Sequence, residues 1–184
     1  MDSKQVALVI AFNGYQPVEY SVPKNLLEQA GIVVATVSNK MGVAHSEEKE
    51  SEPAVAAKVD TLLSDLNLSD YAGIFFIGGP NALENLDNET SYSIIREAFE
   101  KKMPLGAICV ATRILAKAGV LKDKRATGWD GDNQLGALLK EHQAQYQPKD
   151  VVVDGLIITA VGPSAAREFG ENIITMIQEY SNKD

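Results

Sequence analysis

The sequence predicts an α/β domain built on a doubly wound, mostly parallel sheet with helices on both faces. Short apolar runs alternate along the chain with segments of helical pattern, which is typical of such a sheet. The 184 residues are close to the size of one domain of this kind, and 45% of them are hydrophobic. No repeat, linker or low-complexity tract divides the chain, so we expect a single domain over residues 1–184.

Five apolar runs are the predicted strands. They are continuous rather than alternating, as expected of strands that are buried on both faces. The predicted strands are Val6–Ala11, Ile32–Val37, Gly73–Ile77, Leu105–Cys109 and Leu156–Ala160.

Four other segments carry a helical pattern. Gly31 and Gly119 directly follow two of them, and glycine is the usual residue just past the end of a helix. In the last segment an apolar residue recurs every four positions from Ala165 to Ile177, which predicts one stripe packed on the sheet. The predicted helices are Val18–Ala30, Thr90–Lys102, Ala111–Ala118 and Ser164–Tyr180.

The acidic segment His45–Lys58 is predicted to be a solvated loop between strands. It contains Pro53 and lacks apolar periodicity. The two histidines of the chain, His45 and His142, lie in this segment and in a polar helical stretch. We expect both at the surface rather than in a catalytic site.

Charge and hydropathy narrow the choice of partners. The net charge of −8 repels phosphate backbones and anionic lipids, and no apolar run approaches the roughly 20 residues that cross a bilayer. We therefore expect a small-molecule or protein partner, with no nucleic acid and no membrane. The first apolar run lacks a basic flank and a cleavage site, and the only cysteine, Cys109, suits a reducing compartment, so we expect a cytoplasmic protein. No Walker loop or metal-ligand spacing is present, and we expect no cofactor and no metal.

Cys109 falls at a sharp turn between a predicted strand and a predicted helix. At such an elbow the helix dipole and unpaired N–H groups favour a thiolate, which predicts a lowered thiol pKa and a reactive sulfur. The alternative is a small buried hydrophobic residue, the commoner role of a free cysteine.

Two further features lie where ligands bind in a doubly wound sheet. Gly78 and Gly79 follow a predicted strand directly and can present backbone N–H groups to a ligand, or simply form a tight turn. Glu19 stands in the first turn of a predicted helix that Pro17 opens. Its carboxyl group is either a partner of the helix dipole or an acid that faces Cys109 and is protonated by desolvation.

Taken together, these segments resemble the DJ-1/ThiJ/PfpI superfamily over nearly the whole chain. Gly162-Pro163 ahead of Glu168-Phe169 is most similar to the DJ-1/ThiJ branch. The matching pieces, in order, are VALVIAFNGYQPVEYSVPKNLLEQAGIVV, IFFIGGPNALENL, GAICVATRILAKAGVLKDKRATG and VVVDGLIITAVGPSAAREF.

The resemblance implies a flavodoxin-like fold, usually homodimeric, with Cys109 as the reactive cysteine and Glu19 as an acid hydrogen-bonded to its sulfur. Backbone N–H groups at Gly79, the second residue of the glycine pair, and at Val110 would form an anion pocket. Such a pocket can stabilise a tetrahedral oxyanion or an oxidised cysteine.

The chain departs from the family pattern at both positions where members carry a histidine. Val110 stands directly after the cysteine, and Trp129 stands where the DJ-1 branch has a histidine. A Cys-His protease mechanism needs a base within reach of the thiol, so we do not expect it here.

The segment that begins at Trp129 can be interpreted in two ways. Trp129, Asp130, Asp132 and Asn133 form either a variant wall of the pocket or a loop that caps a helix beside a packed tryptophan. Arg113 either covers the pocket or pairs at the surface.

These residues support two main hypotheses of function. The first is an enzyme that acts on reactive carbonyls, like the glyoxalase or deglycase activities of the family, in which Cys109 forms a thiohemiacetal and Glu19 moves protons. The second is a redox-responsive or chaperone-like stress protein in which an oxidant converts Cys109 to a sulfinate. Hydration of an unsaturated substrate, as in isocyanide hydratase relatives, and peptidase activity rank lower.

Overall fold

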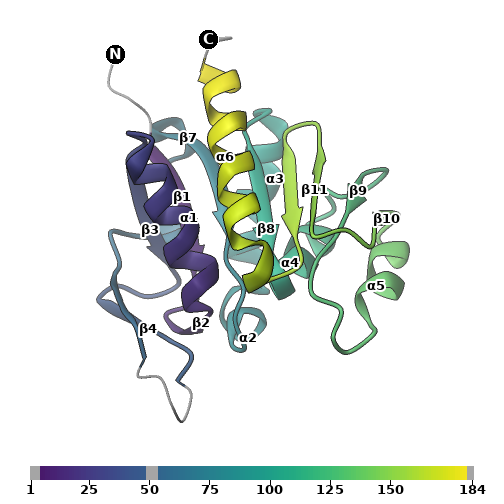
Figure 1. Cartoon of the computed structure of the whole chain (residues 1–184), viewed down its shortest axis with the longest axis horizontal. Coiled ribbons are helices and arrows are strands. Elements are labelled where there is room, and N and C mark those ends of the chain that lie inside the picture. The colour runs from purple at the N-terminus through teal and green to yellow at the C-terminus, as the bar shows by residue number, and fades with distance from the viewer. Residues whose placement is uncertain (1–4, 49–53, 182–184) are drawn as a thin grey trace.

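A mostly parallel sheet lies at the centre of the molecule (Figure 1). The structure is a computed structural model that describes residues 5–48 and 54–181. Within these residues the strand order is β11-β12-β8-β7-β1-β3-β6, and only β11 runs antiparallel to its neighbour. The strands are β1 (Gln5–Ile10), β3 (Val34–Ser38), β6 (Thr61–Leu62), β7 (Tyr71–Phe76), β8 (Leu105–Ile108), β11 (Val151–Asp154) and β12 (Ile157–Ala160).

Alternate residues of β1 face two separate hydrophobic cores. Val6 and Leu8 pack with the residues under α1 (Pro17–Gln29) and α6 (Ala166–Ser181). Ala7 and Val9 pack on the opposite face, where α3 (Glu89–Glu100) and α4 (Thr112–Lys117) lie. The predicted α/β sheet with helices on both faces is therefore confirmed, and the continuous apolar runs reflect burial from both sides.

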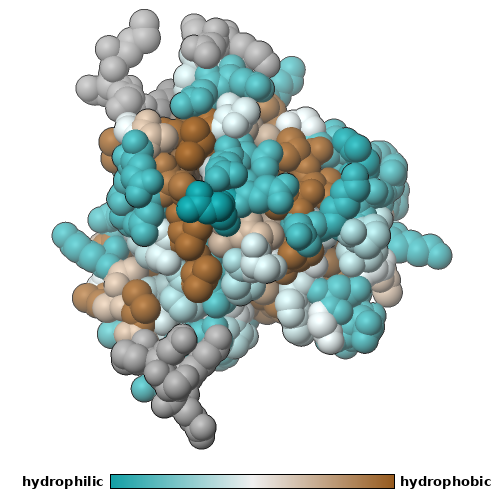
Figure 2. Space-filling view, viewed as in Figure 1, coloured by the Kyte–Doolittle hydropathy of each residue, from teal (hydrophilic) through white to brown (hydrophobic). Residues whose placement is uncertain are grey.

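The two helices of the first face, α1 and α6, pack side by side (Figure 1). The predicted stripe of α6 is buried, with Phe169 and Ile173 fully inaccessible and Ile177 5% exposed. Figure 2 shows apolar side chains gathered along the border of these two helices, between hydrophilic ones.

The prediction of a loop over His45–Lys58 is wrong in part. Residues at both of its ends belong to β4 (Val43–Ser46) and β5 (Ala56–Lys58), which pair antiparallel, and β2 (Asn13–Tyr15) pairs with β4. The buried side chains of β4 and β5 are the small Ala44, Ser46 and Ala57, so the apolar signal of these two strands is weak. Pro53 lies outside the described residues.

Short elements complete the described part of the chain. A two-stranded sheet pairs β9 with β10 beside α5, and four 3-10 turns flank longer elements. In the described residues no helix is long and apolar enough to cross a bilayer. The short elements mentioned above, together with α2, are η1 (Leu63–Asp65), η2 (Leu68–Asp70), α2 (Ala82–Leu86), η3 (Cys109–Ala111), β9 (Arg125–Ala126), α5 (Leu135–Glu141), β10 (Gln145–Tyr146) and η4 (Pro163–Ala165).

Candidate functional site

Cys109 is the first residue after β8 and has a left-handed backbone conformation. Its φ is 65°, so the chain leaves the strand abruptly and enters η3 and then α4. A non-glycine residue in this region is uncommon and is over-represented at functional sites. The side chain is 8% exposed. The Cys109 carbonyl accepts a hydrogen bond from the Trp129 N–H at 3.2 Å, which ties the elbow to the following loop.

Glu19 lies in the first turn of α1 with its side chain fully buried. The Gly78 N–H donates to Glu19 Oε2 at 3.0 Å. Glu19 Oε1 is also buried and has no hydrogen-bond partner of standard geometry, while the carboxyl group interacts with the Cys109 thiol. The structure thus brings Glu19 and Cys109 together from residues 90 positions apart in the sequence.

The glycine pair after β7 makes this approach possible. A Cβ atom on Gly78 would lie 2.6 Å from Cys109 Cβ and 2.7 Å from Glu19 Oε2, so any side chain would collide with both groups. Gly79 has a φ of 131°, and a Cβ atom there would lie 2.4 Å from the Gly14 carbonyl oxygen. Both glycines are therefore needed where the loop passes between β2 and the elbow.

The charge environment of Cys109 opposes thiolate formation overall. The backbone N–H groups of Val110 and Gly79 face the sulfur and lower the pKa of the thiol, as expected for an anion pocket. Burial and the charge of Glu19 raise that pKa by more, so the net direction is upward. The prediction of a lowered thiol pKa is wrong because burial, the larger influence, and the charge of Glu19 together outweigh the two amides.

Glu19 is shifted toward its protonated form. Desolvation by burial raises its pKa from 4.5 to about 7, although its hydrogen bonds with Cys109 and Gly78 act in the opposite direction. The charge of Glu47 adds to the increase. Near neutral pH the carboxyl group is therefore present in both forms, so it can either donate a proton to the sulfur or accept one.

The residues proposed as a variant wall fulfil other roles in the structure. Asp130 Oδ1 accepts a hydrogen bond from the Leu135 N–H at 2.7 Å, and this bond caps the start of α5. The Asn133 N–H donates to the Asp130 carbonyl. Trp129 is 39% exposed and contributes its backbone N–H to the elbow. The capping alternative describes this loop better than a pocket wall does.

Arg113 pairs beneath this loop instead of at the open surface. Its side chain is 8% exposed and donates to Asp132 Oδ1 at 2.7 Å. Its guanidinium lies over the Trp129 ring, 5.6 Å from the ring centroid, which is within the range of a cation–π contact. The Arg113–Asp132 ion pair therefore helps to fix the loop whose Trp129 N–H binds the Cys109 carbonyl.

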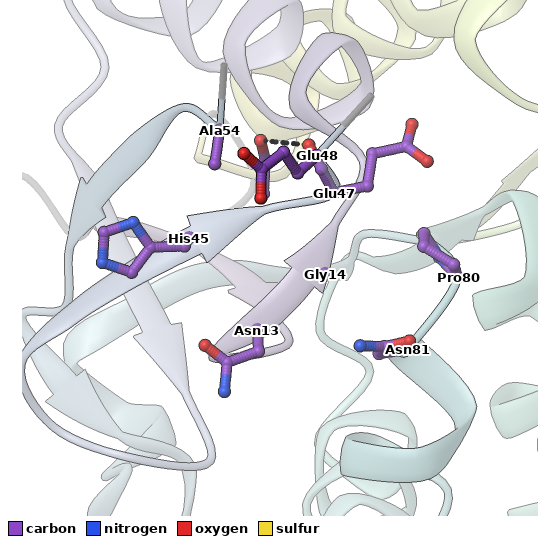
Figure 3. A pocket seen from close by; sticks show the side chains of 9 residues that line it. Asn13, Gly14, His45, Glu47, Glu48, Ala54, Pro80 and Asn81 are labelled. Atoms are coloured by element: carbon purple, nitrogen blue, oxygen red, sulfur yellow. Dashed lines mark hydrogen bonds between the residues drawn. The ribbon is translucent and has the colours of Figure 1, made fainter. Parts of the chain in front are cut away.

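A cavity of about 480 Å³ borders the glycine loop (Figure 3). His45 is exposed and forms part of its rim, whereas His142 lies at the end of α5. In the described residues no group of three or more His, Cys, Asp or Glu side chains is arranged to hold a metal ion. The lining residues are Asn13, Gly14, His45, Ser46, Glu47, Glu48, Ala54, Pro80 and Asn81.

Gln16 and Glu47 lie next to the site, and no role is predicted for either of them from the sequence. Gln16 caps α1, and its position before Pro17 is a signal that could have identified it as a cap. Glu47 belongs to the acidic segment that was predicted to be a solvated loop, and nothing in its sequence context distinguishes it from its acidic neighbours.

The fold and the site define a flavodoxin-like α/β protein with a buried cysteine at a strand-to-helix elbow and a buried glutamate beside it. The chain belongs to the DJ-1/PfpI family, whose pattern matches residues 4–176.

Individual relatives span nearly the whole chain. An uncharacterized protein of Methanocaldococcus jannaschii is 32% identical over 182 residues, which cover 97% of this chain and 85% of that protein. Bacillus subtilis YraA, whose name provisionally describes it as a cysteine protease, is 26% identical over 179 residues, 96% of this chain and 99% of its own. The crystal structure of a ThiJ/PfpI domain protein from Brachyspira murdochii has a TM-score of 0.87 at 21% identity and covers 96% of this chain and 98% of its own.

The raised pKa of Glu19 predicts a pH-dependent difference in stability between the wild type and Glu19→Gln. The folded protein holds this proton more tightly than the unfolded chain does. The resulting stabilisation is fully present below pH 4.5 and is lost as the pH rises through about 7. Relative to Glu19→Gln, the free energy of unfolding of the wild type should fall by about 3 kcal/mol over this window.

Urea denaturation of both proteins between pH 4.5 and pH 8 measures this difference. Glu168→Gln, which changes an exposed glutamate of α6, is the control and should track the wild type. A constant difference between the wild type and Glu19→Gln across this range would show that Glu19 keeps an ordinary pKa.

Proposed function

We propose that the protein is an enzyme that acts on small reactive carbonyl compounds through Cys109 and Glu19. The observation that carries this proposal is a carboxyl group with a pKa of about 7 against a sulfur that two backbone amides also face. A general acid–base group works best when its pKa is near the operating pH. The low exposure of Cys109 favours a substrate of a few carbon atoms.

In the first step the Cys109 sulfur adds to an aldehyde carbon. The Glu19 carboxylate takes the thiol proton as the carbon–sulfur bond forms, and the carbonyl π electrons move onto oxygen. The N–H groups of Gly79 and Val110 stabilise negative charge beside the sulfur. The protonated Glu19 then returns the proton to this oxygen, which gives a thiohemiacetal.

In the second step Glu19 transfers a proton between adjacent carbons. With a 2-oxoaldehyde, the carboxylate removes the proton from the carbon that bears sulfur and delivers it to the neighbouring carbonyl carbon. The hydroxyl proton of the thiohemiacetal moves to the oxygen of that neighbouring carbon. One carbon is oxidised to a thioester and the other is reduced to an alcohol, so no external oxidant is needed. Water then hydrolyses the thioester, which releases a 2-hydroxy acid and restores the thiol.

The alternative is a redox-responsive protein, and the amide pair favours it as well. One peroxide molecule converts the thiolate to a sulfenic acid and releases hydroxide, and a second gives a sulfinic acid and water. Protonated Glu19 and the Gly79 and Val110 amides would each donate to the sulfinate oxygens. This chemistry needs no histidine, and a reducing cytosol would keep the thiol ready for it.

Methylglyoxal turnover tests the enzyme directly. We expect lactate formation by the wild type and a loss of at least about 100-fold in both Cys109→Ala and Glu19→Gln, because each removes a group that reacts. Glu168→Gln should turn over at the wild-type rate. Wild-type protein without turnover, or turnover that survives in Cys109→Ala, contradicts the proposal.

Mild peroxide treatment followed by intact-mass measurement tests the alternative. We expect an adduct of two oxygen atoms that is absent in Cys109→Ser and that forms less completely in Glu19→Gln, because the latter lacks the acidic proton that holds the product. Direct passage to a three-oxygen adduct would show that the pocket does not protect a sulfinate.

We also propose a homodimer as the working form. Val18 at the start of α1 is 41% exposed, and the apolar strip along α1 and α6 offers surface for a second copy (Figure 2). Light scattering should give twice the chain mass, and Val18→Asp should shift the equilibrium toward single chains. A monomer mass for the wild type at micromolar concentration rules this assembly out.

A further inference from the structure

Gln16 connects the backbone of Glu19 to Glu47, which lines the outer cavity. Its side chain is 8% exposed, and its Oε1 accepts a hydrogen bond from the Glu19 N–H at 2.9 Å. Its Nε2 donates to Glu47 Oε1 at 3.3 Å. The Gln16 backbone N–H donates to the Gly78 carbonyl at 3.0 Å, next to the amide that binds Glu19. One side chain therefore contacts both the backbone of Glu19 and the carboxylate of Glu47.

Glu47 is held at the junction of the site and the cavity. It follows β4, and its N–H donates to the Tyr15 carbonyl at 2.8 Å, so its backbone is fixed against β2. It lines the cavity together with His45 and Glu48, the other titratable side chains there (Figure 3). The backbone bond and the Gln16 contact give Glu47 a defined position that an unattached surface glutamate lacks.

Few charged groups act on Glu19 from the elements around it. From η3 the Cys109 thiol contacts it, and from the end of β4 comes the charge of Glu47. The loop after β7 contributes only the Gly78 amide, and Gly162 before η4 has no side chain to present. Among the described residues Glu47 is thus the carboxylate placed to influence Glu19.

We propose that Glu47 is a positioning residue of this site: through Gln16 it holds the first turn of α1, which carries Glu19, and it presents a carboxylate to that turn. The inference rests on the proposed function only in taking Glu19 and Cys109 as the reactive pair. It extends that site to the acidic segment, to which Glu47 belongs. One consequence is that a positively charged group bound in the cavity would weaken the effect of Glu47 on Glu19.

Three substitutions separate charge from contact. Glu47→Gln removes the charge but keeps an oxygen that can accept from Gln16, whereas Glu47→Ala removes both. Glu48→Gln is the matched control, since it removes a neighbouring carboxylate from the same cavity. The titration of Glu19 is followed by carbon NMR of glutamate-labelled full-length protein, with the Glu19 carboxyl resonance assigned by its absence in Glu19→Gln.

We expect the titration midpoint of Glu19 to fall by roughly half a pH unit in both Glu47→Gln and Glu47→Ala, as the loss of one charge screened partly by water would produce. Glu48→Gln should leave it unchanged.

A wild-type midpoint in Glu47→Gln overturns the proposal, as does an equal shift in Glu48→Gln. This titration does not require turnover. If the midpoint shifts in a protein that does not convert methylglyoxal, the inference about Glu47 stands and the proposed enzyme activity fails. If turnover is found without a shift, the enzyme stands and the inference about Glu47 fails.

Discussion

The hydrogen bond from the Gly78 N–H to Glu19 Oε2 is the contact on which the arrangement of the site depends. It joins the first turn of α1 to the loop after β7 and orients a fully buried carboxyl group. The backbone thus holds Oε2, while Oε1 is buried without a hydrogen-bond partner of standard geometry in the described residues. A buried carboxylate without such partners would be strongly disfavoured, so this bond also limits how far the pKa of Glu19 rises.

Two opposing influences act on the same sulfur. The Gly79 and Val110 amides favour negative charge there, whereas Glu19 and burial oppose it. Of the two groups, the carboxyl group, with a pKa of about 7, is the one that changes protonation near neutral pH, whereas the raised pKa of the thiol keeps its proton on the sulfur. In the proposed enzyme Glu19 moves the proton, so that mechanism does not call for a histidine beside the cysteine.

Local pattern predicted the parts of the structure that depend on neighbouring residues. Buried strands give continuous apolar runs, and the change from strand to helix placed Cys109 at its turn. Features that depend on contacts between residues distant in the sequence could not be predicted from local pattern. The strands β4 and β5 bury only the small side chains of Ala44, Ser46 and Ala57. The direction of the thiol pKa depends on burial and on Glu19, which is distant in the sequence. Gln16 and Glu47 meet across 31 residues of sequence, and no periodicity encodes that distance.

Trp129 is a natural fluorescent probe at the turn that carries Cys109. It is the only tryptophan of the chain, its backbone N–H binds the Cys109 carbonyl, and its indole lies against the Arg113 guanidinium. The tryptophan fluorescence of the unlabelled protein therefore arises from a single ring, whose backbone is bound to the turn that carries the sulfur. Emission can follow events at that turn in solution, without a dye and without a substituted residue.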